Sequence, residues 1–305
     1  MTASVDTDVS IPGRAGLVLV ATPIGNLGDL APRAAEALRT ADAIACEDTR
    51  HTRKLLAAAG IEGKRLLAVH AHNELAAGPG IVALIERGQQ VALVSDAGMP
   101  AISDPGEHIV AAVVAAGLAV TCVPGPSAVV VALALSGLPT GRFVFEGFLP
   151  RSGTDRSGRL AEIALESRTI VLYEAPHRII RTLTDLALVC GDSRRASVSR
   201  ELTKKFEETQ RGTLGQLVAS AAQVEPRGEH VIVIEGADPG VTATFDDVAI
   251  RVLVDEQRSR GLRTREAVDA VAGTTGLPRR RVYAVATSAT AAAPAPTPFA
   301  IPANP

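Results

Sequence analysis

The sequence contains no tryptophan, and aromatic residues make up only 3% of its 305 residues. Packing must therefore depend on Val, Leu, Ile and Ala, a composition that suits buried parallel strands covered by helices. Cysteine is also scarce, and Cys46, Cys122 and Cys190 show no Cys-x-x-Cys or Cys/His spacing. This scarcity argues against a disulfide framework or a zinc site and favours a reducing compartment.

No apolar run is long enough to cross a bilayer, because the most apolar region, residues 109–138, is interrupted by Gly117 and by residues 124–126. Residues 1–15 lack the basic and apolar regions of a signal peptide, and we expect a disordered leader there. The net charge is -2, so any contact with nucleic acid must come from local patches. We therefore expect a cytoplasmic protein with no membrane partner.

Two nucleotide-binding fingerprints are also missing. The loop at residues 22–30, "TPIGNLGDL", does not have the G-x-G-x-x-G spacing, and no G-x-x-x-x-G-K-[ST] occurs anywhere. Dinucleotide-binding and P-loop interpretations both lose support. Gly25 and Gly28 then either close a turn or shape a binding loop, and the spacing alone does not decide between the two.

An alternation of short β-rich runs and helical stretches extends to about residue 138. It predicts right-handed crossovers and a parallel sheet in a first lobe at residues 16–139. In residues 140–237, four further runs read as strands and "HRIIRTLTDLALVCG" as a helix. Several connections are too short for crossovers, so we expect a mixed sheet and an overall α/β fold.

A linker follows residue 236, and residues 245–287 predict a small helical domain. Between Arg258 and Arg281 this segment carries seven arginines against Glu266 and Asp269. Such a charge fits an accessory contact with RNA or the ribosome, although a solvated helical surface is the alternative. Residues 288–305 are rich in Pro and Ala, and we expect them to be disordered.

Polar clusters follow the predicted strands of the first lobe, where ligands of such sheets bind. One is "EDTRHTRKLL" at residues 47–56, in which Asp48 or Thr49 is expected to cap a helix. Another is "HAHNE" at residues 70–74. Neither has a recognised metal-ligand spacing, so no metal is predicted.

The loop "SDAGMPAISDPG", residues 95–106, is the most unusual segment. Asp104, Pro105 and Glu107 predict the N-cap, N1 and N3 positions of a helix, close to a capping box. One cap needs far fewer residues, however. A Gly-rich loop exposes main-chain groups that suit an adenine, a ribose or a carboxylate. "VPGPSA", residues 123–128, repeats the arrangement, with Ser127 at a helix start.

Together these strings closely resemble the tetrapyrrole-methylase-like fold of S-adenosylmethionine-dependent methyltransferases, and within it the ribosomal RNA small subunit methyltransferase I family. Further matching strings are "SGLPTGRFVFEGFLP", "YEAPHR", "RELTKKFEE", "RGTL" and "GEHVIVIEG", in family order over roughly residues 17–236. The resemblance implies two α/β lobes with S-adenosylmethionine in the cleft between them, usually in a homodimer. It also implies methylation of the ribose 2′-hydroxyl of a cytidine in 16S rRNA of the 30S subunit, near the decoding centre.

The resemblance places the methyl donor between the two lobes. The donor-binding residues that it implies are Asp96, Ala97, Gly98, Ile102, Ser103, Ser127, Ala128, Leu172, Tyr173, Glu201 and Leu202. To these we add Pro23, Gly25 and Ser95. The sequence departs from the family pattern at Met99, where Thr is usual, at Ala101, which replaces a larger apolar residue, and at Gly141, where Asp is common. The first departure removes a hydroxyl contact with the donor.

Methyl transfer to oxygen is an in-line displacement in which a base assists the hydroxyl. The candidate bases are Glu174, His177, Glu47, Asp48 and His51, and "YEAPHR" is the segment that we favour. Glu174 and His177 could instead simply begin a helix with Arg178 on its surface. Contacts with RNA phosphates are predicted for Arg50, His51, Arg53, Lys54, Arg178, Lys204 and Lys205.

Three alternatives stay open. A precorrin-type tetrapyrrole C-methyltransferase would share the fold and the donor, because function depends on the site rather than the fold. A metal-dependent phosphohydrolase would use Asp48, Asp96 and Asp104. A non-catalytic RNA-binding module would leave the two Ser-Asp turns of residues 95–106 without a role.

Overall fold

The computed structural model describes residues 15–223, 228–238, 247–259, 261–275 and 277–288. It divides into two compact units, one formed by residues 1–149 and 166–239 and the other by residues 150–165 and 240–305. Nearly all of the expected leader and tail lie outside the described residues. The domain boundaries drawn from the sequence stay a prediction. In the described part of the chain, no helix has the length and apolar character that a membrane span requires.

A five-stranded sheet organises the first lobe of the larger unit, in the order β3-β2-β4-β1-β5. Every pairing is parallel, as the alternation of strands and helices predicts. The strands are β1 (Gly16–Val20), β2 (Ala43–Cys46), β3 (Arg65–Ala68), β4 (Gln90–Val94) and β5 (Val120–Val123). All five carboxyl ends therefore meet at one edge of the sheet.

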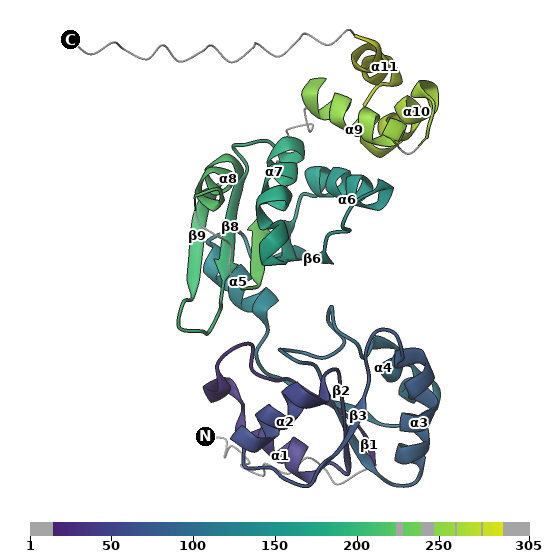
Figure 1. Cartoon of the computed structure of the whole chain (residues 1–305), viewed down its shortest axis with the longest axis vertical. Coiled ribbons are helices and arrows are strands. Elements are labelled where there is room, and N and C mark those ends of the chain that lie inside the picture. The colour runs from purple at the N-terminus through teal and green to yellow at the C-terminus, as the bar shows by residue number, and fades with distance from the viewer. Residues whose placement is uncertain (1–14, 224–227, 239–246, 260, 276, 289–305) are drawn as a thin grey trace, which may run out of the picture. The chain divides into compact units, whose positions relative to one another are not determined.

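Helices cover both faces of this sheet (Figure 1). Val18 and Ile44 pack with α1 (Pro32–Thr40) and α2 (Thr49–Ala58) in one apolar cluster. Leu17 and Ala45, the adjacent strand positions, pack in a second cluster with α3 (Glu74–Glu86) and α4 (Glu107–Ala115). Because successive side chains of a strand point to opposite faces, strands that are apolar throughout are buried on both sides.

The second lobe contains a mixed sheet in the order β6-β7-β10-β8-β9, which confirms the sequence-based expectation. Only β6 and β7 pair in parallel. The strands are β6 (Phe143–Phe148), β7 (Thr169–Glu174), β8 (Arg195–Arg200), β9 (Glu208–Thr213) and β10 (His230–Ile234). The sequence did not predict β9, nor α8 (Leu214–Ala221), which follows it.

Helices also cover the mixed sheet. On one face, Val129 and Leu133 of α5 (Ala128–Ser136) pack against Val231 and Val233 of β10. Ile179 of α7 (Ile179–Cys190) and Leu217 of α8 line a small cavity together with Val198 and His230. Successive side chains of β10 point to opposite faces of the sheet, so α5 lies on one face and α7 and α8 lie on the other.

The smaller unit consists of helices. Three of them, α9 (Asp247–Ser259), α10 (Thr264–Thr275) and α11 (Arg279–Thr287), occupy the segment for which the sequence predicts a helical domain. The fourth, α6 (Thr154–Leu165), contacts α9 and α10, so residues 150–165 group with the C-terminal helices rather than with the second lobe. It contributes buried Leu160 and Ile163.

The N-cap of α4 is not the residue that the sequence predicts. The helix begins at Glu107, and its N-cap is Gly106 with a φ of 140°, not Asp104. Glu74, at the first position of α3, is only 6% exposed. Its Oε1 accepts hydrogen bonds from the backbone N–H groups of Gly106 and His108, each 2.7 Å long. A carboxylate distant in sequence therefore satisfies the donors that a local cap would serve.

We predict that Glu74→Ala lowers the free energy of unfolding by about 2–3 kcal/mol, because the buried N–H of Gly106 and the partly buried N–H of His108 lose their carboxylate acceptor. Urea unfolding of the purified protein measures this loss. Glu107→Ala, at the exposed first residue of the same helix, is the control. It removes only a favourable interaction with the helix dipole, which amounts to about 0.3–1 kcal/mol. Equal losses in the two variants would contradict the role of Glu74.

Candidate active site

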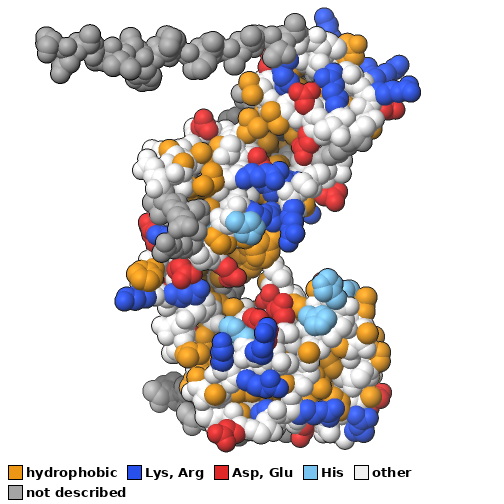
Figure 2. Space-filling view, viewed as in Figure 1, with side chains coloured by type: hydrophobic (Ala, Val, Ile, Leu, Met, Phe, Trp, Pro, Cys, Tyr) orange, Lys and Arg blue, Asp and Glu red, His pale blue; other side chains and the backbone are white. Residues whose placement is uncertain are grey.

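A cavity of about 320 Å³ lies at the carboxyl ends of the parallel strands and is closed by residues of the second lobe. Ile24 follows β1, Glu47 follows β2 and Asp96 follows β4, as the general rule for such sheets requires. Tyr173 and Glu201 belong to the opposite wall. Figure 2 shows acidic side chains gathered in the region where the two lobes meet. The cavity is therefore built from loops of both lobes.

The loop between β4 and α4 forms the floor of this cavity and is tied to the loop after β1. Thr22 N–H donates to the Gly98 carbonyl at 2.9 Å, and Gly98 N–H donates to the Thr22 carbonyl at 3.1 Å. The Thr22 hydroxyl also donates to the Ser95 carbonyl at 3.3 Å. These bonds hold the loop in one shape beside the strand ends.

Backbone strain marks the same loop. Ala101 and Ser103 adopt φ angles of 69° and 60°, and Gly98 has a φ of 82°. A non-glycine residue in this region costs of order 1 kcal/mol or more, and such residues concentrate at ligand-binding sites. A β-branched residue would be a marked outlier at position 101, so alanine suits this backbone.

The opposite wall contains aromatic and strained segments. The Tyr173 ring lies 5.0 Å from the Phe145 ring and 5.5 Å from the Phe148 ring, measured between centroids. Burial, together with the nearby Asp104 carboxylate, raises the pKa of Tyr173 to about 12, so its hydroxyl stays protonated. Glu201 has a φ of 50°. Both walls therefore carry strained backbone beside apolar side chains.

Carboxylates dominate the electrostatics of the cavity. Burial raises the pKa of Asp104 to about 6, aided by Glu47, Asp96 and Glu229, while a hydrogen bond with Ser95 opposes the shift. Burial and the Asp96 carboxylate likewise raise the pKa of Glu47, and His70 opposes part of this increase. Asp96 Oδ1 also accepts from the Asp48 N–H at 3.2 Å. Clustered anions in a half-buried space favour a cationic ligand.

Most of the donor residues implied by the resemblance meet in this cavity. Those that line it are Asp96, Ala97, Gly98, Ile102, Ser103, Ser127, Ala128, Tyr173, Glu201 and Leu202. Four others do not line it. Leu172 is fully buried in β7, and Ser95 is 3% exposed beneath the loop. Pro23 is buried beside Ile24. A Cβ at Gly25 would meet the Lys204 side chain, so Gly25 permits a close approach.

Of the five candidate bases, only Glu47 lines the cavity, and His51 is exposed on α2. Glu174 is fully buried. One of its oxygens accepts from the Thr182 hydroxyl at 2.6 Å, and the other accepts from the Ala175 N–H at 2.9 Å and pairs with Arg178 at 3.1 Å. A carboxylate held in this way anchors the start of α7 and is not free to accept a substrate proton.

The other two predicted catalytic residues lie outside the cavity lining. His177 is exposed in the single turn Pro176–Arg178. Asp48 caps α2 by accepting from Arg50 N–H at 2.7 Å, as the sequence predicts. The Asp48 carboxylate also pairs with the Arg50 guanidinium at 2.9 Å, and this contact lowers the pKa of Asp48 to about 2. A carboxylate with so low a pKa is a weak base.

The predicted phosphate contacts divide into two groups. Arg178 is 18% exposed and is bound to Glu174 and to the Leu149 carbonyl, so it has a structural role. The others are exposed. Lys204 also lines the cavity and pairs with Glu201 at 2.9 Å, and Lys205 lies 5.6 Å from the Phe206 ring. These surface residues are Arg50, His51, Arg53, Lys54, Lys204 and Lys205.

Several lining residues were missed by the sequence analysis. They are Ile24, Asp104, Phe148, Glu229, His230 and Val231. A signal existed, because all of them lie within the strings that carry the family resemblance. Asp104 was assigned to a helix cap or, in the phosphohydrolase alternative, to a metal, and His230 was treated as the start of a strand. His230 is 4% exposed, and burial lowers its pKa, so the imidazole is neutral at pH 7.

The metal-dependent alternative loses its proposed ligand set. Of Asp48, Asp96 and Asp104, only the last two line the cavity. Within the described ranges, no three His, Cys, Asp or Glu side chains are arranged to hold a metal ion. The carboxylates of the cavity are therefore better matched to an organic cation or to ribose hydroxyls.

Comparisons with known proteins agree with this geometry. The family model described as Tetrapyrrole (Corrin/Porphyrin) Methylases matches residues 16–218. Two solved structures share the fold. The methyltransferase CobJ has a TM-score of 0.56 and 21% identity, and the match covers 73% of this chain and 95% of that chain. Diphthine synthase has a TM-score of 0.56 and 17% identity, and the match covers 72% of this chain and 89% of that chain.

Sequence relatives are much closer. Ribosomal RNA small subunit methyltransferase I of Xylella fastidiosa (strain Temecula1) is 50% identical over 90% of this chain and 99% of its own length. The protein of the same name from Synechocystis is 47% identical over 88% of this chain and 95% of its own length. The protein of that name from Mycobacterium bovis is 43% identical over 88% of this chain and 93% of its own length. The chain belongs to the ribosomal RNA small subunit methyltransferase I family, within the tetrapyrrole methylases.

Proposed function

We propose that this methyltransferase transfers a methyl group from S-adenosylmethionine to the ribose 2′-hydroxyl of a cytidine in 16S rRNA, near the decoding centre of the 30S subunit. The observation that carries the proposal is the acidic cavity at the strand ends, in a chain whose relatives are named as small-subunit rRNA methyltransferases. By the same resemblance, the enzyme works in the cytoplasm as a homodimer and without a metal.

The residues of the cavity fit this donor. Its volume of about 320 Å³ lies at the lower end of the range of small-molecule sites, roughly 300–1,000 Å³. Ile24, Ile102 and Phe148 supply apolar surface for a purine ring. Asp96 and Glu229 supply acceptors for ribose hydroxyls and a negative potential that matches a sulfonium.

When bound, S-adenosylmethionine supplies an already activated methyl group, so the protein's main task is to hold the acceptor oxygen in line with it. Correct orientation of two reactants can contribute about 7–11 kcal/mol. The Thr22–Gly98 hydrogen bonds and the strained residues Ala101 and Ser103 keep the floor of the cavity rigid. A preformed floor reduces the entropy that would otherwise be lost when the reactants are aligned.

Asp104 is the carboxylate best suited to accept the proton of the 2′-hydroxyl. It lines the cavity, and its pKa of about 6 places the ionised form in excess at pH 7 while keeping it a stronger base than an ordinary Asp. General bases work best when their pKa lies near the operating pH. Glu47, also in the lining and also shifted upward, is the second candidate.

The direct test of the function incubates unmodified 30S particles with labelled S-adenosylmethionine and maps the modified nucleotide. We expect the label on one cytidine ribose, and calorimetry on the ligand-free protein should show binding of the donor. Label on a base instead of a ribose would contradict the 2′-hydroxyl assignment. Transfer to a tetrapyrrole and not to 30S would favour the macrocycle methylases.

The base assignment predicts a pH profile. In the wild type, kcat/KM should rise with pH through about 6, because Asp104 of the free enzyme must lose its proton to act as a base. Asp104→Asn should lower kcat by about 10²–10⁴-fold and remove this rise. Asp48→Asn should leave the profile in place, since Asp48 is already ionised far below pH 6. A pH profile of Asp104→Asn that still rises through about pH 6 would instead assign the role of general base to Glu47.

Asp104 also predicts how stability depends on pH. Its folded pKa is raised to about 6, so ionisation destabilises the fold, and stability falls as pH rises from about 4 to 6. Asp104→Asn should therefore stabilise the protein at pH 8, by about 1 kcal/mol after allowance for solvent screening, or about 2–4 °C in Tm. Asp48, whose folded pKa is lowered to about 2, should behave oppositely, with Asp48→Asn reducing Tm at pH 8. Calorimetric melting of both variants at pH 8 and pH 4 measures the difference.

A further inference from the structure

The smaller unit concentrates positive charge in a chain that is slightly negative overall. Residues 258–281 contain seven arginines and two carboxylates, whereas the whole chain has a formal charge of -2. Blue side chains gather over α10 and α11 in Figure 2. A local excess of this kind either stabilises the unit internally or serves a partner, and the contacts of each arginine distinguish the two.

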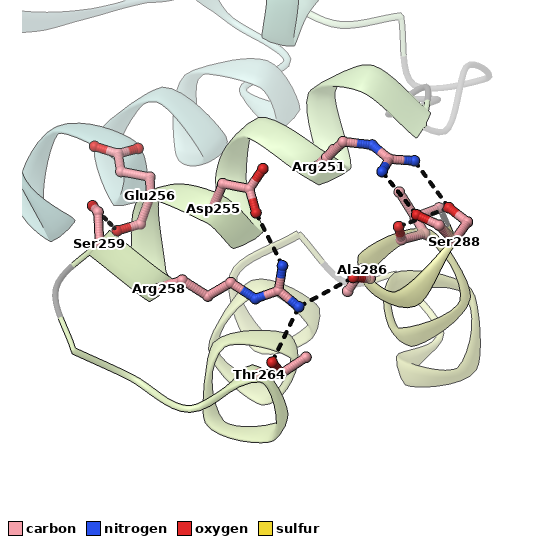
Figure 3. A network of polar contacts seen from close by, with 9 residues as sticks. Arg251, Asp255, Glu256, Arg258, Ser259, Thr264, Ala286 and Ser288 are labelled. Atoms are coloured by element: carbon pink, nitrogen blue, oxygen red, sulfur yellow. Dashed lines mark hydrogen bonds and ion pairs between the residues drawn. The ribbon is translucent and has the colours of Figure 1, made fainter. Parts of the chain in front are cut away.

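Two arginines of α9 serve the fold (Figure 3). Arg258 donates to Asp255 in its own helix, to the Thr264 hydroxyl of α10 and to the Ala286 carbonyl of α11, each at 3.1 Å. Arg251 donates to the Ser288 carbonyl and hydroxyl at 3.0 and 2.9 Å. These guanidinium groups join the three helices and are committed to that role.

The arginines of α10 and α11 are arranged differently. Arg263, Arg265 and Arg280 are exposed, and no described residue accepts a hydrogen bond from, or forms an ion pair with, their guanidinium groups. Arg279 pairs with Asp269, whose pKa is lowered by that pair and by nearby Arg265. One carboxylate thus lies between two arginines and cannot neutralise both. Positive charge remains in excess on this face.

Carboxylates of the same unit pair with Arg279 and Arg281, but folding does not account for Arg280 between them. Arg279, Arg280 and Arg281 fill the first turn of α11, which contains no acidic residue. Cations at a helix N-terminus oppose the helix dipole, and neighbouring like charges repel. The apolar core of the unit, which includes Ile250, Val268 and Val282, does not require them. An anionic partner would remove the repulsion.

We propose that the face formed by Arg263, Arg265, Arg279 and Arg280 binds the phosphate backbone of the RNA substrate. This inference rests on the proposed function, which provides a polyanionic substrate. A guanidinium presents a planar fork that matches two phosphate oxygens, so arginine suits this contact better than lysine. Such contacts raise affinity and fix register without reading the sequence.

The test uses the full-length protein with Arg263, Arg265 and Arg280 all changed to Gln, which leaves the Arg279–Asp269 pair intact. Binding to 30S subunits and to a 16S rRNA fragment is measured by fluorescence anisotropy across a salt series. The matched control changes Arg39, Arg65 and Arg87 to Gln. These three exposed arginines lie toward the amino ends of the parallel strands, away from the cavity loops.

For the variant with Arg263, Arg265 and Arg280 changed, we expect Kd for RNA to rise about tenfold and the slope of log K against log salt to fall by about 2–3, since each phosphate contact contributes about 0.7–0.9. Donor binding, measured by calorimetry, should be unchanged, and the matched control should keep both the RNA affinity and the slope. Replacing the same three residues by Lys should restore most of the slope.

Suppose that the wild-type protein binds and methylates 30S subunits. An unchanged Kd and salt slope in the Gln variant would then overturn the RNA-binding face and leave the proposed function intact. Equal loss in the matched control would also overturn the RNA-binding face, because the effect would then be one of general charge. Wild-type protein that binds no RNA would instead overturn the proposed function. Should the Gln variant lose its thermal transition, Arg280→Glu alone gives the same readout with a smaller perturbation.

Discussion

The reciprocal hydrogen bonds between Thr22 and Gly98 determine the shape of the candidate active site. They join the loops after β1 and β4, which lie side by side because those strands are neighbours in the parallel sheet. Ala101 and Ser103 of the same loop lie in the left-handed region, where non-glycine residues are strained. The cavity therefore depends on sheet topology first and on side-chain identity second.

The carboxylates around this loop illustrate a conflict between stability and function. Asp96 raises the pKa of both Glu47 and Asp104, and Glu47 also raises the pKa of Asp104, which is unfavourable for the folded protein. In the function that we propose, the same field attracts a cationic donor and supplies a base of moderate strength. By contrast, Asp48 and Glu174, each neutralised by an arginine, contribute to the fold and are withdrawn from chemistry.

Much of the fold was predictable from the sequence because the buried strands are short apolar runs. The edge strand β9 was missed since "ETQRGT" is polar, and α3 was not identified because Gly78, Pro79 and Gly80 resemble a turn. Motif order predicted most of the residues that line the cavity. It could not exclude Glu174 as a base, since the sequence cannot show that both of its oxygens are satisfied, or that Glu74 caps the helix in place of Asp104.

The bond between Glu74 and the start of α4 has a consequence for local motion. One side chain links the first turn of α3 to the first turn of α4, and the intervening segment contains β4 and the cavity floor. Neither helix can fray at its beginning without breaking the shared carboxylate's contacts. Residues 74–108 should therefore exchange their slow amide protons as a single cooperative block, so that opening the floor requires partial unfolding and not the swing of a flap.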